Sequence, residues 1–471
     1  GAVLASAAGA TAALAQDRDD ILGGFEDEDE TFAVDEEALD EAEPRWWDVS
    51  GSVELSGSIN YRSHRSDTGT DYTGLQRLRL RGNLALDVVL PELAYFRDGR
   101  IRAEGWGFWD PAYLINGRSD YTEPLLDLYG LDGEVGEMWI QGKLHDRVDL
   151  KLGRQVVIWG RSETLRVLDV LNPLDNREPG RVDIEDLRRP LGMLKLSGYA
   201  GPWSLDLIAV PEIRFDRSPV FGSDFYPAVF LPNPAPPPAR VPFLPVERKP
   251  EDFEDAELAA RVLGIFPGWD VSFHAAWFWN DAPRIDSFPA TGPSADPRSP
   301  LGDLVHDRLW LVGSGGNWTL GSWLLKYELA YVDGLGFATV PDRKGRLDAL
   351  LGVEYYGFTD TTIVFEVANR HLIDHEPGVR SLPNFVREDQ QELALRISRS
   401  FLRERLDVML LAFALGWDAS DGSLVRFDVS YDVRDALTVG VGILPFQDGD
   451  IPPITRIGRN DRLLFSVKWS F

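Results

Sequence analysis

The chain has 471 residues, a formal net charge of −28 at pH 7 and a sequence pI of about 4.6. This excess of acidic residues argues against nucleic acid as a partner, because phosphate binding requires basic patches. The absence of cysteine excludes disulfides, thiol catalysis and cysteine-based metal sites.

The N-terminal part of the chain divides into two segments. Residues 1–15 look like the remains of a secretory signal, with a small apolar run that ends on an Ala-Leu-Ala cleavage site. The alternative is a flexible alanine-rich tail. Residues 16–45 are strongly acidic and poor in apolar side chains, which predicts a disordered periplasmic tail. A competing hypothesis is that residues 17–44 dock a periplasmic partner or plug a barrel through the apolar residues at 21–25.

From residue 46 to residue 471, apolar and polar residues alternate, which places them on opposite faces of strands. The mean hydropathy of −0.19 does not exclude a membrane protein, because alternating residues average out in a transmembrane β-barrel. Aliphatic outer faces opposite charged inner faces predict an all-β fold, a single antiparallel transmembrane barrel of about 18 strands (16–18). The predicted strands lie near 46–62, 75–90, 99–111, 134–145, 147–159, 189–200, 202–214, 255–266, 268–280, 306–317, 319–333, 345–357, 359–371, 389–402, 404–417, 422–433, 435–446 and 460–471.

The predicted connections alternate in length. Short links are expected at 145–146, 200–202, 267–268, 359–360 and 434–435. Long loops are expected near 63–74, 112–133, 160–188, 215–254, 281–305, 334–344, 372–388 and 447–459. Short periplasmic turns and long extracellular loops are typical of bacterial outer-membrane barrels. We therefore expect an outer-membrane location, contact with outer-membrane lipid and periplasmic N- and C-termini.

The last strand alternates clearly and ends on an aromatic residue, Phe471, two positions after Trp469. Outer-membrane barrels resemble one another at this end, and such a strand is thought to be recognised by the barrel-assembly machinery. We expect Phe471 and Trp469 to form this assembly signal.

The loop at 160–188 carries many charges of both signs and a row of apolar residues. The apolar residues, Leu165, Val167, Leu168, Val170 and Leu171, could anchor the loop against the inner wall. Opposed arginines and carboxylates would then form a constriction that selects by charge and size. The constriction residues would be Arg161, Arg166, Asp169, Asp175, Arg177, Asp183 and Asp186. The alternative is a solvated extracellular loop held by its own salt bridges.

Four arginines are predicted on the lumen wall: Arg77, Arg79, Arg81 and Arg154. The first three alternate along one strand and would attract anions or organic acids. Wall carboxylates could equally neutralise them in a rigid ion-pair lattice that selects nothing. Both interpretations remain open at this point.

Three segments resemble a family of largely uncharacterised proteobacterial outer-membrane barrels. The first is Gly153-Arg154-Gln155-Val156-Val157-Ile158-Trp159-Gly160, a GRQxxxWG motif; the others are at 170–175 and 183–188. Members of this family are often considered together with resistance-nodulation-division type exporters and are proposed to move hydrophobic or lipid-like compounds. The resemblance implies a conduit and supplies no catalytic or binding residues.

The sequence contains no nucleophile elbow, Walker loop or dinucleotide fingerprint, so we expect no enzyme, and nothing predicts a cofactor or a metal. We expect a porin-like channel for passive, loop-gated passage of small or amphipathic solutes. It would act either alone or in a system for lipids or hydrophobic compounds. The alternatives are a barrel-embedded hydrolase and an outer-membrane scaffold with a blocked lumen.

Overall fold

The computed structural model describes residues 45–66, 69–93, 95–181, 187–226, 246–286, 303–381, 384–450, 454–455 and 457–471. The predictions for the signal segment at 1–15, and for the acidic tail up to residue 44, lie outside the described residues. The same holds for Asp183 and Asp186, two of the expected constriction residues.

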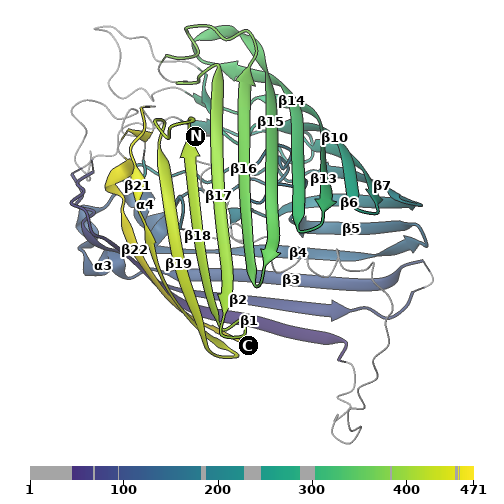
Figure 1. Cartoon of the computed structure of the whole chain (residues 1–471), viewed down its shortest axis with the longest axis horizontal. Coiled ribbons are helices and arrows are strands. Elements are labelled where there is room, and N and C mark those ends of the chain that lie inside the picture. The colour runs from purple at the N-terminus through teal and green to yellow at the C-terminus, as the bar shows by residue number, and fades with distance from the viewer. Residues whose placement is uncertain are drawn as a thin grey trace, which may run out of the picture.

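A closed antiparallel barrel of 18 strands forms the molecule (Figure 1). Each strand pairs with its neighbour along the chain, and the first pairs with the last between residues 52–60 and 462–470. All eighteen predicted strands are confirmed. They are β1 (Trp47–Asn60), β2 (Gly74–Val89), β3 (Arg97–Trp109), β4 (Leu131–His145), β5 (Val148–Gln155), β6 (Leu191–Ala200), β7 (Trp203–Val210), β9 (Glu257–Phe266), β10 (Trp269–Trp279), β13 (Arg308–Leu320), β14 (Trp323–Phe337), β15 (Val340–Phe358), β16 (Thr361–Leu372), β17 (Asp389–Phe401), β18 (Leu406–Leu415), β19 (Ser423–Arg434), β20 (Leu437–Leu444) and β22 (Arg462–Ser470).

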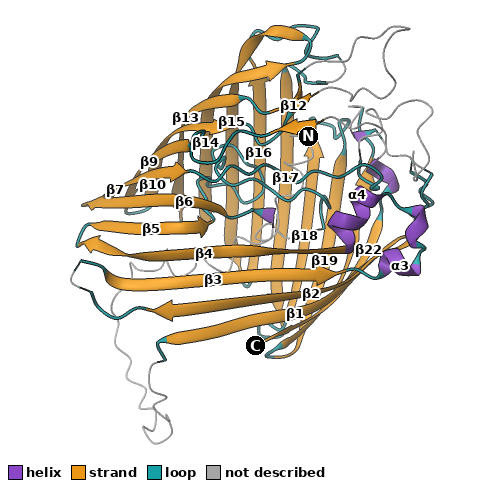
Figure 2. Cartoon of the chain, turned by 180° about the vertical axis from the view of Figure 1, so that it is seen from behind, coloured by secondary structure: helices purple, strands orange, loops and turns teal. Residues whose placement is uncertain are grey.

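The smaller elements lie in the connections (Figure 2). Short strands β8 (Val246–Arg248), β11 (Arg284–Ile285) and β12 (Asp303–Val305) form a separate sheet, and β21 (Phe446–Gln447) pairs with β19. Helical turns are α3 (Ala112–Ile115), η1 (Arg118–Asp120), α4 (Glu123–Leu125), η2 (Leu126–Gly130) and η5 (Ile457–Arg459). In the part of the chain that the structure describes, no helix is both long and apolar enough to cross a membrane.

Short turns gather at one end of the barrel and longer loops at the other, as the alternation in the sequence predicts. The loop expected at 334–344 is wrong: β14 continues to Phe337, β15 begins at Val340, and these two residues pair. The glycines in this stretch do not end the strands. Gly334 adopts φ 102°, and the register shifts on either side of Leu335, so the extra residues are accommodated as bulges.

The outer face of the barrel is apolar and carries exposed tryptophans near both ends, as an outer-membrane barrel requires. The exposed tryptophans at the short-turn end are Trp46, Trp47, Trp203, Trp269, Trp318, Trp323 and Trp469; those at the long-loop end are Trp109, Trp310 and Trp417.

The inner face carries buried charged side chains such as Asp206, Lys326 and Glu366, as the sequence predicts, but it also has an apolar region. Toward the long-loop end it is apolar over much of the circumference. The buried inward side chains include Met193, Ile208, Ala276, Leu309, Leu311, Ala330, Leu350 and Phe413. Such side chains are stable inside a barrel only when other apolar groups cover them, and the loop that follows β5 supplies those groups.

Candidate functional site: a loop folded into the barrel

The chain leaves the barrel wall at the end of β5, within the GRQxxxWG motif. Gly153 adopts φ 124°, and a Cβ at this position would collide with the backbone of Met138 and Trp139 on β4, so only glycine fits. The side chain of Gln155 is buried and donates a hydrogen bond of 3.2 Å to the carbonyl oxygen of Met193. This part of the motif therefore turns the chain from the wall toward the lumen.

The second part of the motif lies inside the barrel. Trp159 is only 1% exposed, and its ring centroid lies 5.0 Å from that of His274 on the inner face of β10. A Cβ on Gly160 would lie 2.9 Å from a carboxylate oxygen of Glu328 on β14. The loop backbone can therefore reach the far wall at this point because it carries no side chain there.

Two wall carboxylates hold the loop backbone. Glu328 on β14 accepts hydrogen bonds from the backbone N–H groups of Arg161, Ser162 (2.8 Å) and Leu168 (2.9 Å). Both carboxylate oxygens serve as acceptors. Charge-assisted bonds of this kind are about twice as strong as neutral ones.

Glu366 on β16 holds the same turn from the neighbouring side. It accepts from the N–H groups of Glu163 (2.9 Å), Thr164 (3.0 Å) and Leu165 (3.2 Å), and from the hydroxyl of Ser162 (2.6 Å). Glu366 and Glu328 are both fully buried. The turn at 161–168 is thus fixed on the wall opposite the strand from which the loop departs.

Ion pairs add to this attachment. Glu163 of the loop lies 3.6 Å from the ammonium group of Lys326 and 3.3 Å from the guanidinium group of Arg396. Arg161 pairs with Asp270 on β10 at 2.8 Å. The loop therefore contacts β10, β14, β16 and β17 through charged groups as well as through its backbone.

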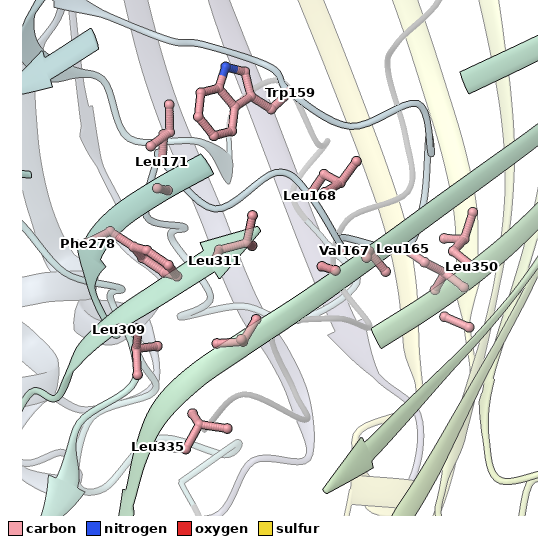
Figure 3. Close-up of a cluster of buried hydrophobic side chains, with 14 of the residues drawn as sticks. Trp159, Leu165, Val167, Leu168, Leu171, Phe278, Leu309, Leu311, Leu335 and Leu350 are labelled. Carbon is pink, nitrogen blue, oxygen red and sulfur yellow. The ribbon is translucent and has the colours of Figure 1, made fainter. Parts of the chain in front are cut away.

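Apolar packing fills the space between loop and wall (Figure 3). Leu165, Val167 and Leu168 of the loop point toward Leu311 and Leu350 of the wall. All five belong to one buried cluster. The predicted anchors Leu165, Val167, Leu168 and Leu171 are at most 2% exposed, and Val170 is partly buried against the same cluster. The loop is therefore packed into the interior of the barrel and is not a solvated external segment.

The middle of the loop is held by Asp169 and Asn172. Asp169 pairs with Arg166 at 3.1 Å and with Arg188 at 3.0 Å. Burial alone would raise the pKa of Asp169, but the two guanidinium groups outweigh it, so the pKa lies below its ordinary value. Asn172 accepts from the N–H of Val157 and donates to the carbonyl oxygens at 155 and 189, which ties the two ends of the loop together.

The far part of the loop returns to the side of the barrel formed by β2 and β4. Arg177 pairs with Asp175 at 2.6 Å and with Asp132 on β4 at 3.0 Å. Burial acts to raise the pKa of Asp175, but the hydrogen bond and the charge of Arg177 lower it by more, so the pKa lies below its ordinary value. These contacts bring the loop back to the wall beside its point of departure.

Glu178 meets the arginines predicted on the lumen wall. It lies 2.9 Å from Arg77, 3.2 Å from Arg79 and 3.1 Å from Arg181. Burial acts to raise the pKa of Glu178, but these three charges lower it well below the ordinary range. Two members of the predicted ladder are therefore engaged in a lattice that fixes the loop.

The other predicted site residues lie apart from this lattice. Arg81 is stacked 4.8 Å from the ring of Trp106 and donates to Asn83. Arg154 shares a face of β5 with the exposed Leu152 and pairs with Glu212 at 2.5 Å, so it lies at the rim of the wall and not on its inner face.

At the C-terminus, Phe471 exchanges two backbone hydrogen bonds with Gly51 and lies 5.0 Å from the ring of Trp469; both aromatic side chains are exposed. Their recognition by the assembly machinery stays a prediction.

Sequence reasoning missed the wall residues that hold the loop, Lys326, Glu328, Glu366 and Arg396, and the loop residue Glu163 that pairs with two of them. A signal was present, because Glu328 and Glu366 sit in inward rows beside Ala330, Val332, Val364 and Ala368. A buried carboxylate among apolar neighbours requires a partner. No pattern along the strand indicates that the partner is a backbone turn more than 150 residues away.

No metal site is indicated. Among the described residues, no group of three or more His, Asp or Glu side chains could hold a metal ion. His371 contacts Asp389 at 3.0 Å, and His375 contacts the carbonyl oxygen of Val386 at 3.1 Å.

A match to a family description now places the molecule. Residues 54–471 match a family described as "Protein of unknown function (DUF1302)". The chain belongs to the DUF1302 family. No curated protein matches its sequence.

Solved structures resemble this DUF1302 barrel in fold. OccAB3 of Acinetobacter baumannii is 11% identical with a TM-score of 0.53, and the match covers 90% of this chain and 99% of that one. OccK9 (OpdG) of Pseudomonas aeruginosa is 12% identical with a TM-score of 0.51, covering 90% and 97%. A BenF-like porin from Pseudomonas fluorescens Pf-5 is 11% identical with a TM-score of 0.50, covering 90% and 98%. At these identities the likeness shows the barrel fold alone.

Proposed function

We propose that this DUF1302 protein is a porin-like channel of the bacterial outer membrane, and that the loop after β5 forms its constriction. The observation that carries the proposal is the attachment of this loop across the lumen, by Glu328 and Glu366 on one side and by Arg77 and Arg79 on the other. The similarity of the fold to a structure described as a BenF-like porin supports it.

We infer that the solutes are small or amphipathic. Charged groups of both signs border the loop, while the inner wall beneath it is apolar. A path with polar and apolar sides suits a molecule that has both kinds of surface. The family resemblance in the sequence supports a place in a transport system for lipids or hydrophobic compounds.

Gating would be the release of the turn at 161–168 from the wall carboxylates of Glu328 and Glu366. Its packed apolar anchors and buried charges make the closed arrangement the ground state. Only a movement of the whole turn would widen the path, because individual side chains such as Leu168 are fully enclosed.

The chain ends are part of the same proposal. We place the short turns and both termini in the periplasm, with residues 17–44 available to a periplasmic partner. Phe471 and Trp469, exposed at the end of β22, would be the assembly signal. Protease protection in intact cells tests the orientation, because only extracellular loops are cleaved there.

Conductance in planar bilayers tests the channel. Arg166, which bonds Asp169 and the carbonyl oxygen of Asn172, is a cation of the proposed constriction. We expect Arg166→Ala to shift ion selectivity toward cations, because the local field loses one positive charge. Arg403→Ala, in the exposed turn after β17, is the matched control and should leave selectivity unchanged. An unaltered selectivity in the first variant would remove Arg166 from the constriction.

A second candidate is an outer-membrane scaffold with a blocked lumen. The dense packing of Leu165, Leu168 and Leu171 against the wall favours it. It predicts no ion current from correctly folded protein and a partner held at the loops. The same bilayer measurement therefore separates the two functions.

A further inference from the structure

The barrel wall is interrupted between β4 and β5. β4 pairs with β3 along its length, from Leu131 onward, but pairs with β5 only from Met138, whose partner is Arg154. Residues 131–137 therefore lack a backbone partner on the β5 side within the described part of the chain. Side chains bridge this edge at two points: Arg154 donates to the carbonyl oxygen of Val135 at 3.4 Å, and Glu137 accepts from the N–H group of Val156 at 2.9 Å. Figure 2 shows β4 continuing past the end of β5.

This open edge lies at membrane depth. Trp109 on β3, the register partner of Leu131, is 49% exposed in the position of an interfacial aromatic, and the edge extends from there toward the short-turn end. Leu131, Val135 and Met138 point outward and are exposed. Open sheet edges are not tolerated against hydrocarbon, because each unsatisfied backbone group costs several kcal/mol.

The backbone is adapted to the interruption on both sides. On β4, the register against β3 shifts between Ala103 and Gly105, which places an extra residue in the strand at 136–137. A bulge of this kind bends a strand and ends pairing. On β5, Gly153 adopts its positive φ at the last paired rungs. The gap is therefore a built feature of the wall.

Side-chain ion pairs close the gap in place of a backbone ladder. Glu134 lies 3.1 Å from Arg217 and 3.6 Å from Arg189, and it also pairs with Arg214. Asp132 pairs with Arg217 at 3.0 Å. Side chains can part and re-form without unzipping strands, so this closure is reversible.

Charged groups of both signs gather at the gap. The ion pairs there join the arginines Arg154, Arg177, Arg189, Arg214 and Arg217 to the carboxylates Asp132, Glu134, Asp175 and Glu212. In addition, the buried Nε of Arg189 has no hydrogen-bond partner among the described residues. The same guanidinium group donates through Nη1 to the carbonyl oxygen of Phe215 at 2.7 Å, so its Nε is the donor that it retains for an anion, behind an apolar outer rim.

We propose that the gap between β4 and β5 is a lateral portal, through which an amphiphile with an acyl-like chain and an anionic head group moves between lumen and membrane. The inference rests on the proposed channel function and adds the class of substrate and its route. The acyl-like chain would pass the apolar rim at Val135. The anionic head group would replace the protein carboxylates as the partner of Arg189, Arg214 and Arg217.

Block of single-channel current by laurate tests the portal, with acetate as the control for the head group alone. Val135→Trp fills the outer rim of the gap, and Val312→Trp is the matched control, since Val312 is an exposed outward residue of β13 far from the gap. Ile158→Trp, at a half-exposed position beside the end of β5, is a second variant in case the first does not fold.

We expect laurate, but not acetate, to block the wild-type channel. The rate of block should fall by roughly fivefold or more in Val135→Trp and stay unchanged in Val312→Trp. The open-channel conductance should be equal in the wild type and in these two variants. The portal would be overturned if laurate blocked Val135→Trp and Ile158→Trp at the wild-type rate, or if it did not block the wild type. Either result would leave the channel function intact. No current through the wild type would overturn the channel, and with it the portal.

Discussion

Removal of the Glu366 carboxylate should release the loop from the wall. In Glu366→Ala, the N–H group of Glu163 and the hydroxyl of Ser162 lose their acceptor. The N–H groups of Thr164 and Leu165 lose one of two acceptors and keep Ser162 Oγ, at 3.3 Å and 2.8 Å. Each buried group left unsatisfied costs about 1–3 kcal/mol. Partial rehydration of the turn offsets part of this cost. The attached loop is then less stable by about 3–5 kcal/mol, which is a factor of roughly 10² to 10⁴ in the equilibrium between attached and released loop.

Hydrogen exchange of purified protein in detergent measures this equilibrium directly, since the amides at 163–168 exchange when the turn detaches. We expect their protection to fall by about 10²-fold or more, and single-channel conductance to rise and fluctuate. Glu404→Ala, in the exposed turn after β17, is the matched control and should leave both unchanged. Wild-type protection and conductance in Glu366→Ala would refute the attachment.

Three further changes test neighbouring parts of the structure. Leu168→Ala leaves a cavity between loop and wall and should destabilise the attached loop by about 2–5 kcal/mol, measured by the same amide exchange; unchanged protection would contradict the packing. The pKa values of Asp169, Asp175 and Glu178 are lowered in the folded protein, so their stabilisation is present above the unfolded pKa near 4 and is lost as pH falls through the lower folded values. Conductance should therefore increase as the pH falls below about 4, and an unchanged conductance there would contradict the role of these three carboxylates. Gly153→Ala places a Cβ against β4 at a positive φ and should cost about 1–3 kcal/mol, seen as a lower unfolding temperature of the folded band on gels; wild-type behaviour would show that the turn does not require glycine.

Much of the fold could be predicted from the sequence, because strand pairing in a barrel is local. Alternation such as Leu463, Phe465 and Val467 defines a lipid face by itself, and short turns fix which strands are neighbours. The predicted loop at 334–344 is wrong because Gly334 allows a bulge in a continuing hairpin.

The site was less accessible to sequence reasoning because its contacts are long-range. The anchors Leu165 and Leu168 could be predicted from their apolar character within a charged loop. Their partners could not, because Leu311 and Leu350 follow the same alternation whether their inward neighbours are water or a loop. The gap between β4 and β5 was also invisible, since it depends on where one strand ends relative to its neighbour.

We infer that the loop after β5 occupies the lumen and sets the width of the channel. Planar-bilayer conductance of a variant in which residues 161–187 are replaced by a short glycine-serine linker tests it most directly. We expect a channel of severalfold higher conductance with little charge selectivity, because the wide barrel is then open. A conductance and selectivity equal to those of the wild-type protein would contradict the claim.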